Sequence, residues 1–317
     1  MAKSKDKRIS RALFPYVGGK HRHARWIAQE LDKIPHRCYI EPFCGAASVF
    51  FRKAKVKINL LNDYNHNITA IFQALRDSPD ELIDLLELME YSEDLYYEAH
   101  AQLFRVDLTV VQRAAYHLFL LNAMCGRPHV KRNPKEGDMG CTNYGFAHGT
   151  TKNRNIKLGC RGGGFAHGTT KNRNIKLTES SPASQFLLCI RNSAVVILSK
   201  YAQFIDMLND VQIMNRDGMN LIRRLDKPNV LFYIDPPYED QKNSNNSQPY
   251  ENINHIELHE LLVNMKYAKW ILSGYKTDTY LERYAGHHIE EKNTVMTCAG
   301  SSEKKYHKVT ECLIFSH

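Results

Sequence analysis

Short apolar runs, each bounded by polar or small residues, recur towards both ends of the chain and predict the strands of an α/β sheet. The run at 230–234 (Val-Leu-Phe-Tyr-Ile) is apolar at every position, as in a parallel strand buried on both faces. Runs of the same kind predict further strands at 38–43, 57–62, 211–215, 270–274 and 309–315. A helix is expected to start at 49–51, after the small-residue turn 44–48.

Between these strands the apolar spacing changes to that of helices. Apolar residues at 68, 71, 72 and 75 follow the i, i+3, i+4, i+7 pattern, and those at 82, 85, 86 and 89 repeat it after Ser78 and Pro79. Residues 65–122 are therefore expected to be helical, 126–177 rich in loops, and 183–208 largely helical. The pattern predicts one α/β domain interrupted by a helical and loop-rich insertion.

The insertion contains an exact internal repeat. The 14 residues from Gly145 to Leu158 recur unchanged from Gly164 to Leu177, with a period of 19 residues. Perfect identity indicates a recent duplication of coding DNA, and two copies are too few for a solenoid. We interpret the extra copy as a tolerated surface insertion.

Composition limits the class of protein. The chain has 317 residues, 43% of them hydrophobic, with no apolar stretch of membrane-spanning length and no apolar signal core after the basic N-terminus. Its eight cysteines form no CxxC pair, so we expect reduced thiols and a cytoplasmic location. Cys141 and Cys160, with His148 and His167, match no known metal-binding spacing, and no metal site is expected.

The positive charge is concentrated in the insertion. Residues 127–176 hold eleven Lys or Arg against Glu136 and Asp138, so this segment alone accounts for the net charge of +9. Basic residues among Gly, Asn and Thr indicate a surface that meets phosphates, and a merely solvated loop is the alternative.

The most informative motif is Asp235-Pro236-Pro237-Tyr238, directly after the strand predicted at 230–234. A carboxylate and a proline carbonyl accept hydrogen bonds, two prolines stiffen the turn, and the tyrosine ring offers a stacking face. This combination suits an exocyclic amino group on a planar base; an ordinary strand-to-loop turn is the alternative. The small-residue turn at 44–48 and the strand that ends at Asp63 are typical of a nucleotide site, in which the carboxylate meets ribose hydroxyls.

Four segments, in this order, resemble motifs of the DNA adenine-N6 methyltransferases of the Dam type, the D12 class: Phe14–Lys20, Glu41–Ser48, Asn62–Asn65 and Asp235–Tyr238. Weaker similarities lie at Leu121–Arg127, Gly162–Phe165 and Glu311. The resemblance covers nearly the whole chain. It implies a Rossmann-like, S-adenosylmethionine-dependent methyltransferase domain at 1–77 and 189–317, and a target-recognition insertion at 78–188. The second repeat copy, with its Gly-Gly-Phe lead-in, fits the family better, so the first is interpreted as the passenger.

The same resemblance implies the cofactor S-adenosylmethionine. Asp63 is expected to accept from the ribose, Asp217 from the adenine amino group, and Tyr16 and Lys20 to lie at the methionine end; Lys20 could instead pair with a structural carboxylate. Ala47 stands where the family usually has glycine, and an alanine fits there if its φ is negative or if the ligand does not come too close. The implied cofactor residues are Tyr16, Lys20, Phe43, Gly45, Ala47, Asp63, Asp217 and Asp235.

The implied reaction is methyl transfer to N6 of an adenine flipped out of double-stranded DNA. Asp235 and the Pro236 carbonyl would each accept an N6 hydrogen, which localises the nitrogen lone pair for in-line attack, and Tyr238 would stack on the base. The catalytic set is Asp235, Pro236, Pro237 and Tyr238. The expected DNA contacts are Arg127, Lys131, Arg132, Asn143, Asn153, Arg154, Asn172 and Arg173.

Three alternatives stay open. A methyltransferase for cytosine N4 or for RNA usually has Ser or Asn in place of Asp235, and a nucleotide-dependent oxidoreductase needs the GxGxxG that this chain lacks. A catalytically silent DNA-binding paralogue would keep the fold. The expected partner is double-stranded DNA, with a cognate restriction endonuclease as a further candidate. The protein is expected to be a monomer. We expect it to be encoded by a bacterium or a phage and to be associated with the nucleoid.

Overall fold

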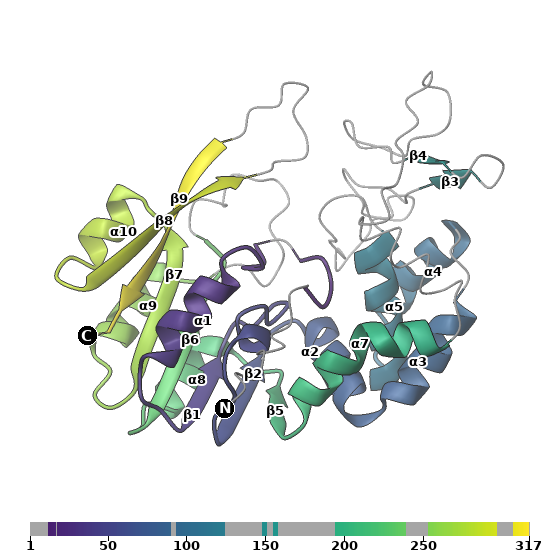
Figure 1. The fold of residues 1–317 in the computed structure, drawn as a ribbon, viewed down its shortest axis with the longest axis horizontal. Helices are drawn as coiled ribbons and strands as arrows, with labels where there is room; N and C mark the ends of the chain where they lie inside the picture. Colours follow the sequence, from purple (N-terminus) through teal and green to yellow (C-terminus); the bar gives the residue numbers. More distant parts are fainter. Residues whose placement is uncertain are drawn as a thin grey trace, which may run out of the picture.

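A computed structural model describes residues 12–16, 18–89, 93–123, 148–150, 155–157, 194–238, 253–296 and 307–316. Its framework is a seven-stranded sheet in the order β5-β2-β1-β6-β7-β9-β8 (Figure 1). The strands are β1 (Cys38–Glu41), β2 (Ile58–Asn62), β5 (Val211–Met214), β6 (Val230–Ile234), β7 (Lys269–Tyr275), β8 (His288–Met296) and β9 (His307–Phe315). The first five of these in spatial order are parallel, and β9 runs antiparallel to both of its neighbours.

Six of these strands confirm the apolar runs in the sequence. The seventh, β8, was not predicted. The helix start expected at 49–51 is wrong, because the chain forms only the short 3₁₀ helix η1 (Phe50–Arg52) there. The next residue, Lys53, is already extended, so the turn does not continue into a longer helix.

The apolar strand β6 serves two hydrophobic clusters because its side chains alternate between the faces of the sheet. Leu231 and Tyr233 belong to one cluster, and Phe232 and Ile234 to the other. The first face also packs against α1 (Ala24–Asp32). The second packs against α8 (Gly218–Arg224), α9 (His255–Val263) and α10 (Asp278–Arg283). Burial on both faces explains why the run has no polar residue.

A group of five helices continues the first cluster beyond the β5 side of the sheet (Figure 1). They are α2 (His66–Asp77), α3 (Pro79–Leu88), α4 (Glu93–Gln102), α5 (Val110–Ala123) and α7 (Ala194–Leu208). The helices predicted in 65–122 are therefore confirmed, and α3 begins at Pro79 after Ser78 as expected. Of the segment predicted to be largely helical at 183–208, residues 194–208 are helical and 183–193 lie outside the described residues. Among the described residues, no helix is long and apolar enough to cross a bilayer.

The region predicted to be loop-rich contains one described ladder. Strands β3 (His148–Thr150) and β4 (Asn155–Lys157) pair antiparallel within the first copy of the repeat. The second copy lies outside the described residues, as do all eight expected DNA contacts and the two cysteines, Cys141 and Cys160, that were considered as metal ligands. The boundaries of the insertion at 78–188 stay a prediction.

Burial keeps two histidines of the helical group neutral. It lowers the pKa of His100 in α4 to about 4 and that of His117 in α5 to about 3. Both values lie below the unfolded value of about 6.5, so unfolding takes up protons at acid pH and stability is greatest above that value. The free energy of unfolding is expected to fall below pH 6.5 by up to about 1.4 kcal/mol per pH unit for each histidine.

Chemical denaturation of the wild type and His117→Phe between pH 7 and pH 5 measures this effect. The variant should lose stability more gradually, since one protonation site is removed. Equal pH dependence in the two proteins would contradict the assignment.

Candidate active site at the carboxyl edge of the sheet

The strand order has a topological switch point between β1 and β6. The chain leaves β1 towards β2 on one side, while β6 lies on the other, so the strand order reverses between β1 and β6. In open α/β sheets, ligands bind outside the carboxyl ends of the strands at such a point. The segments that begin at Pro42 and Asp235 follow these two strands, which places the predicted turn and the tetrapeptide at this switch point.

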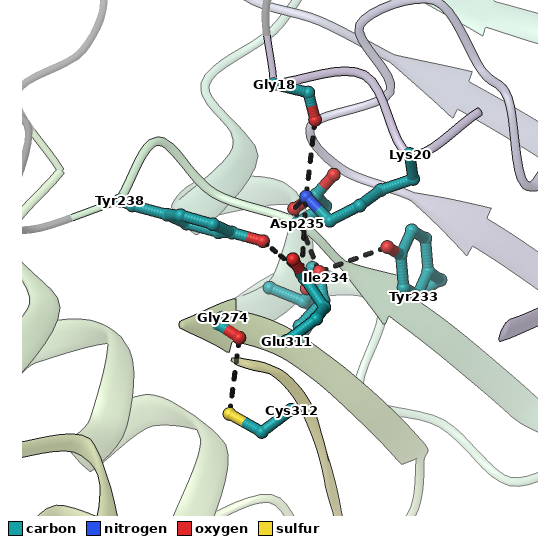
Figure 2. A network of polar contacts seen from close by, with 10 residues as sticks. Gly18, Lys20, Tyr233, Ile234, Asp235, Tyr238, Gly274, Glu311 and Cys312 are labelled. Carbon is teal, nitrogen blue, oxygen red and sulfur yellow. Dashed lines mark hydrogen bonds and ion pairs between the residues drawn. The ribbon is translucent and has the colours of Figure 1, made fainter. Parts of the chain in front are cut away.

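Asp235 is anchored through a single oxygen. Its Oδ1 accepts from the Lys20 ammonium at 2.6 Å and from the Ser273 hydroxyl at 2.8 Å (Figure 2). Ser273 lies in β7, beside β6, and its Oγ accepts in turn from the Tyr233 hydroxyl at 3.0 Å. The side chain of Asp235 is 17% exposed, whereas that of Lys20 is 7% exposed. The predicted catalytic carboxylate is thus reachable from solvent, and its anchors are buried.

Tyr238 is held by a second carboxylate. Its hydroxyl donates to Glu311 Oε1 in β9 at 2.5 Å, and Figure 2 shows these two side chains converging beside Asp235. The Lys20 ammonium lies 4.6 Å from the centroid of the Tyr238 ring, and the Tyr275 ring packs edge-on with centroids 4.4 Å apart. The ring that was predicted to stack on a base is therefore fixed by three neighbours.

Charges in this cluster are balanced around Lys20. Burial lowers the pKa of the Lys20 ammonium, but Asp235 and Glu311 outweigh burial and raise it overall. Burial raises the pKa of Glu311, and the nearby Asp235 adds to the rise. Burial also raises the pKa of Glu41 in β1 to about 8, so this carboxyl is largely protonated at neutral pH and contributes little charge beside Asp235.

The turn after β1 needs glycine at position 45, both for its backbone conformation and for the Tyr16 ring that packs against it. Gly45 has a φ of +47°, which favours glycine, and a Cβ there would lie 2.7 Å from Cε1 of Tyr16. Asp63, at the end of β2, secures this turn: its Oδ2 accepts from the Gly45 N–H at 2.9 Å, and its Oδ1 from the Asn65 N–H at 2.9 Å. Burial raises the pKa of Asp63, and these two hydrogen bonds oppose the rise.

Asn62 joins three loops at the same edge. Its side-chain amide donates to the carbonyls of Pro42 at 2.8 Å and Arg216 at 3.0 Å, and its oxygen accepts from the Arg216 N–H at 2.9 Å. The side chain is fully buried, so all of these bonds form without competing water. Asn62 thereby fixes the loops after β1, β2 and β5 relative to one another.

Ala47 has a left-handed backbone conformation. An alanine was expected to fit here if its φ were negative or if the ligand did not come too close, and its φ is +48°. A side chain in this left-handed conformation costs about 1–2 kcal/mol, because Cβ crowds the following carbonyl oxygen. Ala47 is fully buried, so the surrounding packing holds it there.

Ala47→Gly is therefore expected to raise the free energy of unfolding by up to about 1 kcal/mol, the relief of strain exceeding the added chain entropy. Urea denaturation would measure it, with Ala46→Gly as the control. Ala46 is buried in the same turn without a positive φ, so its replacement should only destabilise. Equal destabilisation by Ala47→Gly and Ala46→Gly would show that the backbone of Ala47 is not strained.

Two further predicted cofactor residues, Asp217 and Phe43, make contacts within the protein. Asp217 is exposed at the start of α8, where its side chain caps the helix by accepting from the Asn220 N–H at 2.7 Å. The next residue, Gly218, faces Phe43: a Cβ on it would lie 2.3 Å from that ring. Phe43 thus packs on the start of α8.

The sequence interpretation missed Ser273 and Tyr275 of β7 and gave no role to Glu41 or Tyr233. Ser273 could have been found, because β7 was predicted and the carboxyl ends of parallel strands meet at one edge. Within the described residues, no group of three or more His, Cys, Asp or Glu could hold a metal ion.

Comparison with known proteins identifies what this arrangement is similar to. A family model described as D12 class N6 adenine-specific DNA methyltransferase matches residues 16–146 and 191–298. A curated relative, the Type II methyltransferase M1.LlaDCHI of Lactococcus lactis subsp. cremoris, is 30% identical over 125 residues. These span 37% of this chain and 42% of the relative, so the match covers less than half of that protein. Residues 147–190, between the two family matches, hold nearly all of both repeat copies.

Proposed function

The chain belongs to the D12 class of N6 adenine-specific DNA methyltransferases, and on that premise we propose that it transfers the methyl group of S-adenosylmethionine to N6 of an adenine in double-stranded DNA. The observation that carries the proposal is the pairing of Asp235 and Tyr238 at the switch point of the sheet. One residue offers a carboxylate and the other a ring, side by side, as an amino group on a planar base requires. The family supports DNA methylation; the target atom, the cofactor and its residues are our proposal.

The residues beside Asp235 fit S-adenosylmethionine. Gly45 has no side chain and packs against the Tyr16 ring at the turn, and Asp63 keeps one lone pair on each oxygen beyond its two backbone hydrogen bonds. We assign Gly45 and Ala47 to the methionine and ribose portions, Asp63 to the ribose hydroxyls, and Tyr16 to the edge of the turn. When bound, S-adenosylmethionine supplies an electrophilic methyl group.

Asp235 performs the main chemical task of the protein. Its carboxylate accepts one N6 hydrogen and the Pro236 carbonyl accepts the other, which draws the nitrogen towards tetrahedral geometry and localises its lone pair. Asp235 also takes up the proton that N6 loses as the new bond forms. Tyr238 holds the base plane against its ring, fixed by Glu311 and Tyr275.

The target amine lies inside the duplex, so the adenine must be flipped out to reach Asp235. We assign the basic segment 127–176 to the phosphates, since neutralising them offsets part of the flipping cost. We propose Asp217 as the acceptor for the cofactor adenine, with Phe43 packing beneath it. The curated relative of this chain is named as a Type II methyltransferase, which supports a restriction endonuclease as a further partner.

The test is transfer of labelled methyl from S-adenosylmethionine to unmethylated genomic DNA, followed by nucleoside mass spectrometry. N6-methyladenine in the DNA is the expected product. N4-methylcytosine, or methylation of RNA alone, would move the enzyme to another substrate class. DNA binding with no methylated nucleoside would favour the silent DNA-binding paralogue.

A further inference from the structure

The two carboxylate oxygens of Asp235 have different surroundings. Oδ1 receives both hydrogen bonds, from Lys20 and Ser273, whereas Oδ2 has no hydrogen-bond donor among the described residues. A carboxylate oxygen has two lone pairs, so two donors saturate Oδ1. The atom with capacity for an incoming amino group is therefore Oδ2.

We infer that Lys20 and Ser273 are positioning residues that hold Oδ1 of Asp235, so that Oδ2 is presented to the target amino group. This inference rests on the proposed function and deepens it. It gives Lys20 a role at the acceptor carboxylate, where the family resemblance placed it at the methionine end of the cofactor.

The position of Lys20 supports this role. Its ammonium reaches three oxygens: Asp235 Oδ1 at 2.6 Å, the Gly18 carbonyl at 3.3 Å and Glu311 Oε1 at 3.6 Å. A buried ammonium is costly unless it is paired, and Lys20 donates hydrogen bonds to Asp235 and Gly18 and forms an ion pair with Glu311. With these contacts made, Lys20 has little capacity left for a cofactor carboxylate.

Lys20 also separates two acidic side chains. Asp235 and Glu311 both contact the same ammonium, and without it they would form a carboxylate pair that favours sharing one proton. A protonated Asp235 accepts hydrogen bonds poorly, so the cation keeps the acceptor in its working form. Other ionisable groups face this pair from β1, β6, the tetrapeptide and β7: Glu41, Tyr233, Tyr238 and Tyr275.

The experiment compares Lys20→Met, Lys20→Arg and Ser273→Ala with the wild type. Lys33→Met is the matched control, because Lys33 follows α1, is exposed, and pairs with Glu30 away from Asp235. Single-turnover methyl transfer to DNA is measured from pH 6 to pH 9.5, and binding of S-adenosylhomocysteine is measured by calorimetry. Thermal unfolding of each variant confirms that it is folded.

Lys20→Met is expected to lower the single-turnover rate at pH 7 by about 100-fold, with recovery as pH rises and with affinity for S-adenosylhomocysteine changed less than about threefold. Lys20→Arg should recover part of the rate, and Ser273→Ala should lose about tenfold without a shift of the pH profile. The double variant K20M/E311Q should lose the pH dependence of Lys20→Met, because no second carboxylate remains to share the proton, and should regain only part of its neutral-pH rate, because Oδ1 still lacks the Lys20 hydrogen bond.

Weakened binding of S-adenosylhomocysteine with a wild-type pH profile would overturn the inference and return Lys20 to the cofactor. If Lys20→Met does not fold, a wild-type rate in Ser273→Ala would overturn it. A wild type that methylates no DNA would instead remove the proposed function, and the inference with it.

Discussion

Asp235→Ala is expected to lower the single-turnover rate of methyl transfer by at least about 1,000-fold, with little change in affinity for S-adenosylhomocysteine. The variant loses the acceptor that localises the N6 lone pair and takes up its proton. Asp235 is not among the residues that shape the Gly45 turn, so cofactor binding should persist. Rapid-quench transfer assays and calorimetry measure the two quantities separately.

Removal of Asp235 leaves Lys20 with Glu311 as its remaining carboxylate partner, so some loss of stability is expected as well. Rates should therefore be compared at a temperature where the variant is folded. Asp278→Ala, an exposed replacement in α10, is the control and should be fully active. Activity in Asp235→Ala within tenfold of the wild type would refute the catalytic assignment.

Asp63→Ala is expected to weaken S-adenosylhomocysteine binding by about 100-fold or more. The variant removes two hydrogen bonds to a charged group, each worth about 1.5–3 kcal/mol, that fix the Gly45 turn and the residue before α2. It also removes the acceptor proposed for the ribose. Titration calorimetry measures the affinity.

Asp63→Asn is the graded comparison, because its one remaining oxygen can secure only one of the two N–H groups. Its affinity should lie between those of the wild type and Asp63→Ala. Wild-type affinity in the folded alanine variant would show that the nucleotide lies elsewhere along the sheet edge.

The parts of the fold that could be predicted are those whose signal is apolar and local. Strand β6 is predicted by a continuous apolar run, and the helix after Ser78 by apolar residues with the helical spacing i, i+3, i+4, i+7. Strand β8 was missed because its first half, His288–Asn293, carries mostly charged or polar residues at the exposed edge of the sheet. An edge strand beside β9 needs no buried face of its own, so no alternation marks it.

The site shows the same division. Asp235, Tyr238 and Asp63 were found from motifs that end predicted strands. The pairing of Lys20 with Asp235 was not predicted, because 215 residues separate the two and only the sheet order brings them together. The positive φ of Ala47 could not be predicted, because an alanine carries no sequence signal of a left-handed backbone and the packing around it imposes that conformation.

The parallel pairing of β2 with β5 joins residues 59–62 to 211–214 across the whole intervening chain, including both repeat copies. In the unfolded state the entropy of closing such a long loop grows only with the logarithm of its length. Adding or removing one 19-residue repeat unit changes that cost by only about 0.1 kcal/mol. The stability of the sheet therefore depends very little on the length of the chain between β2 and β5. The repeat in that segment could duplicate with almost no loss of stability in the sheet.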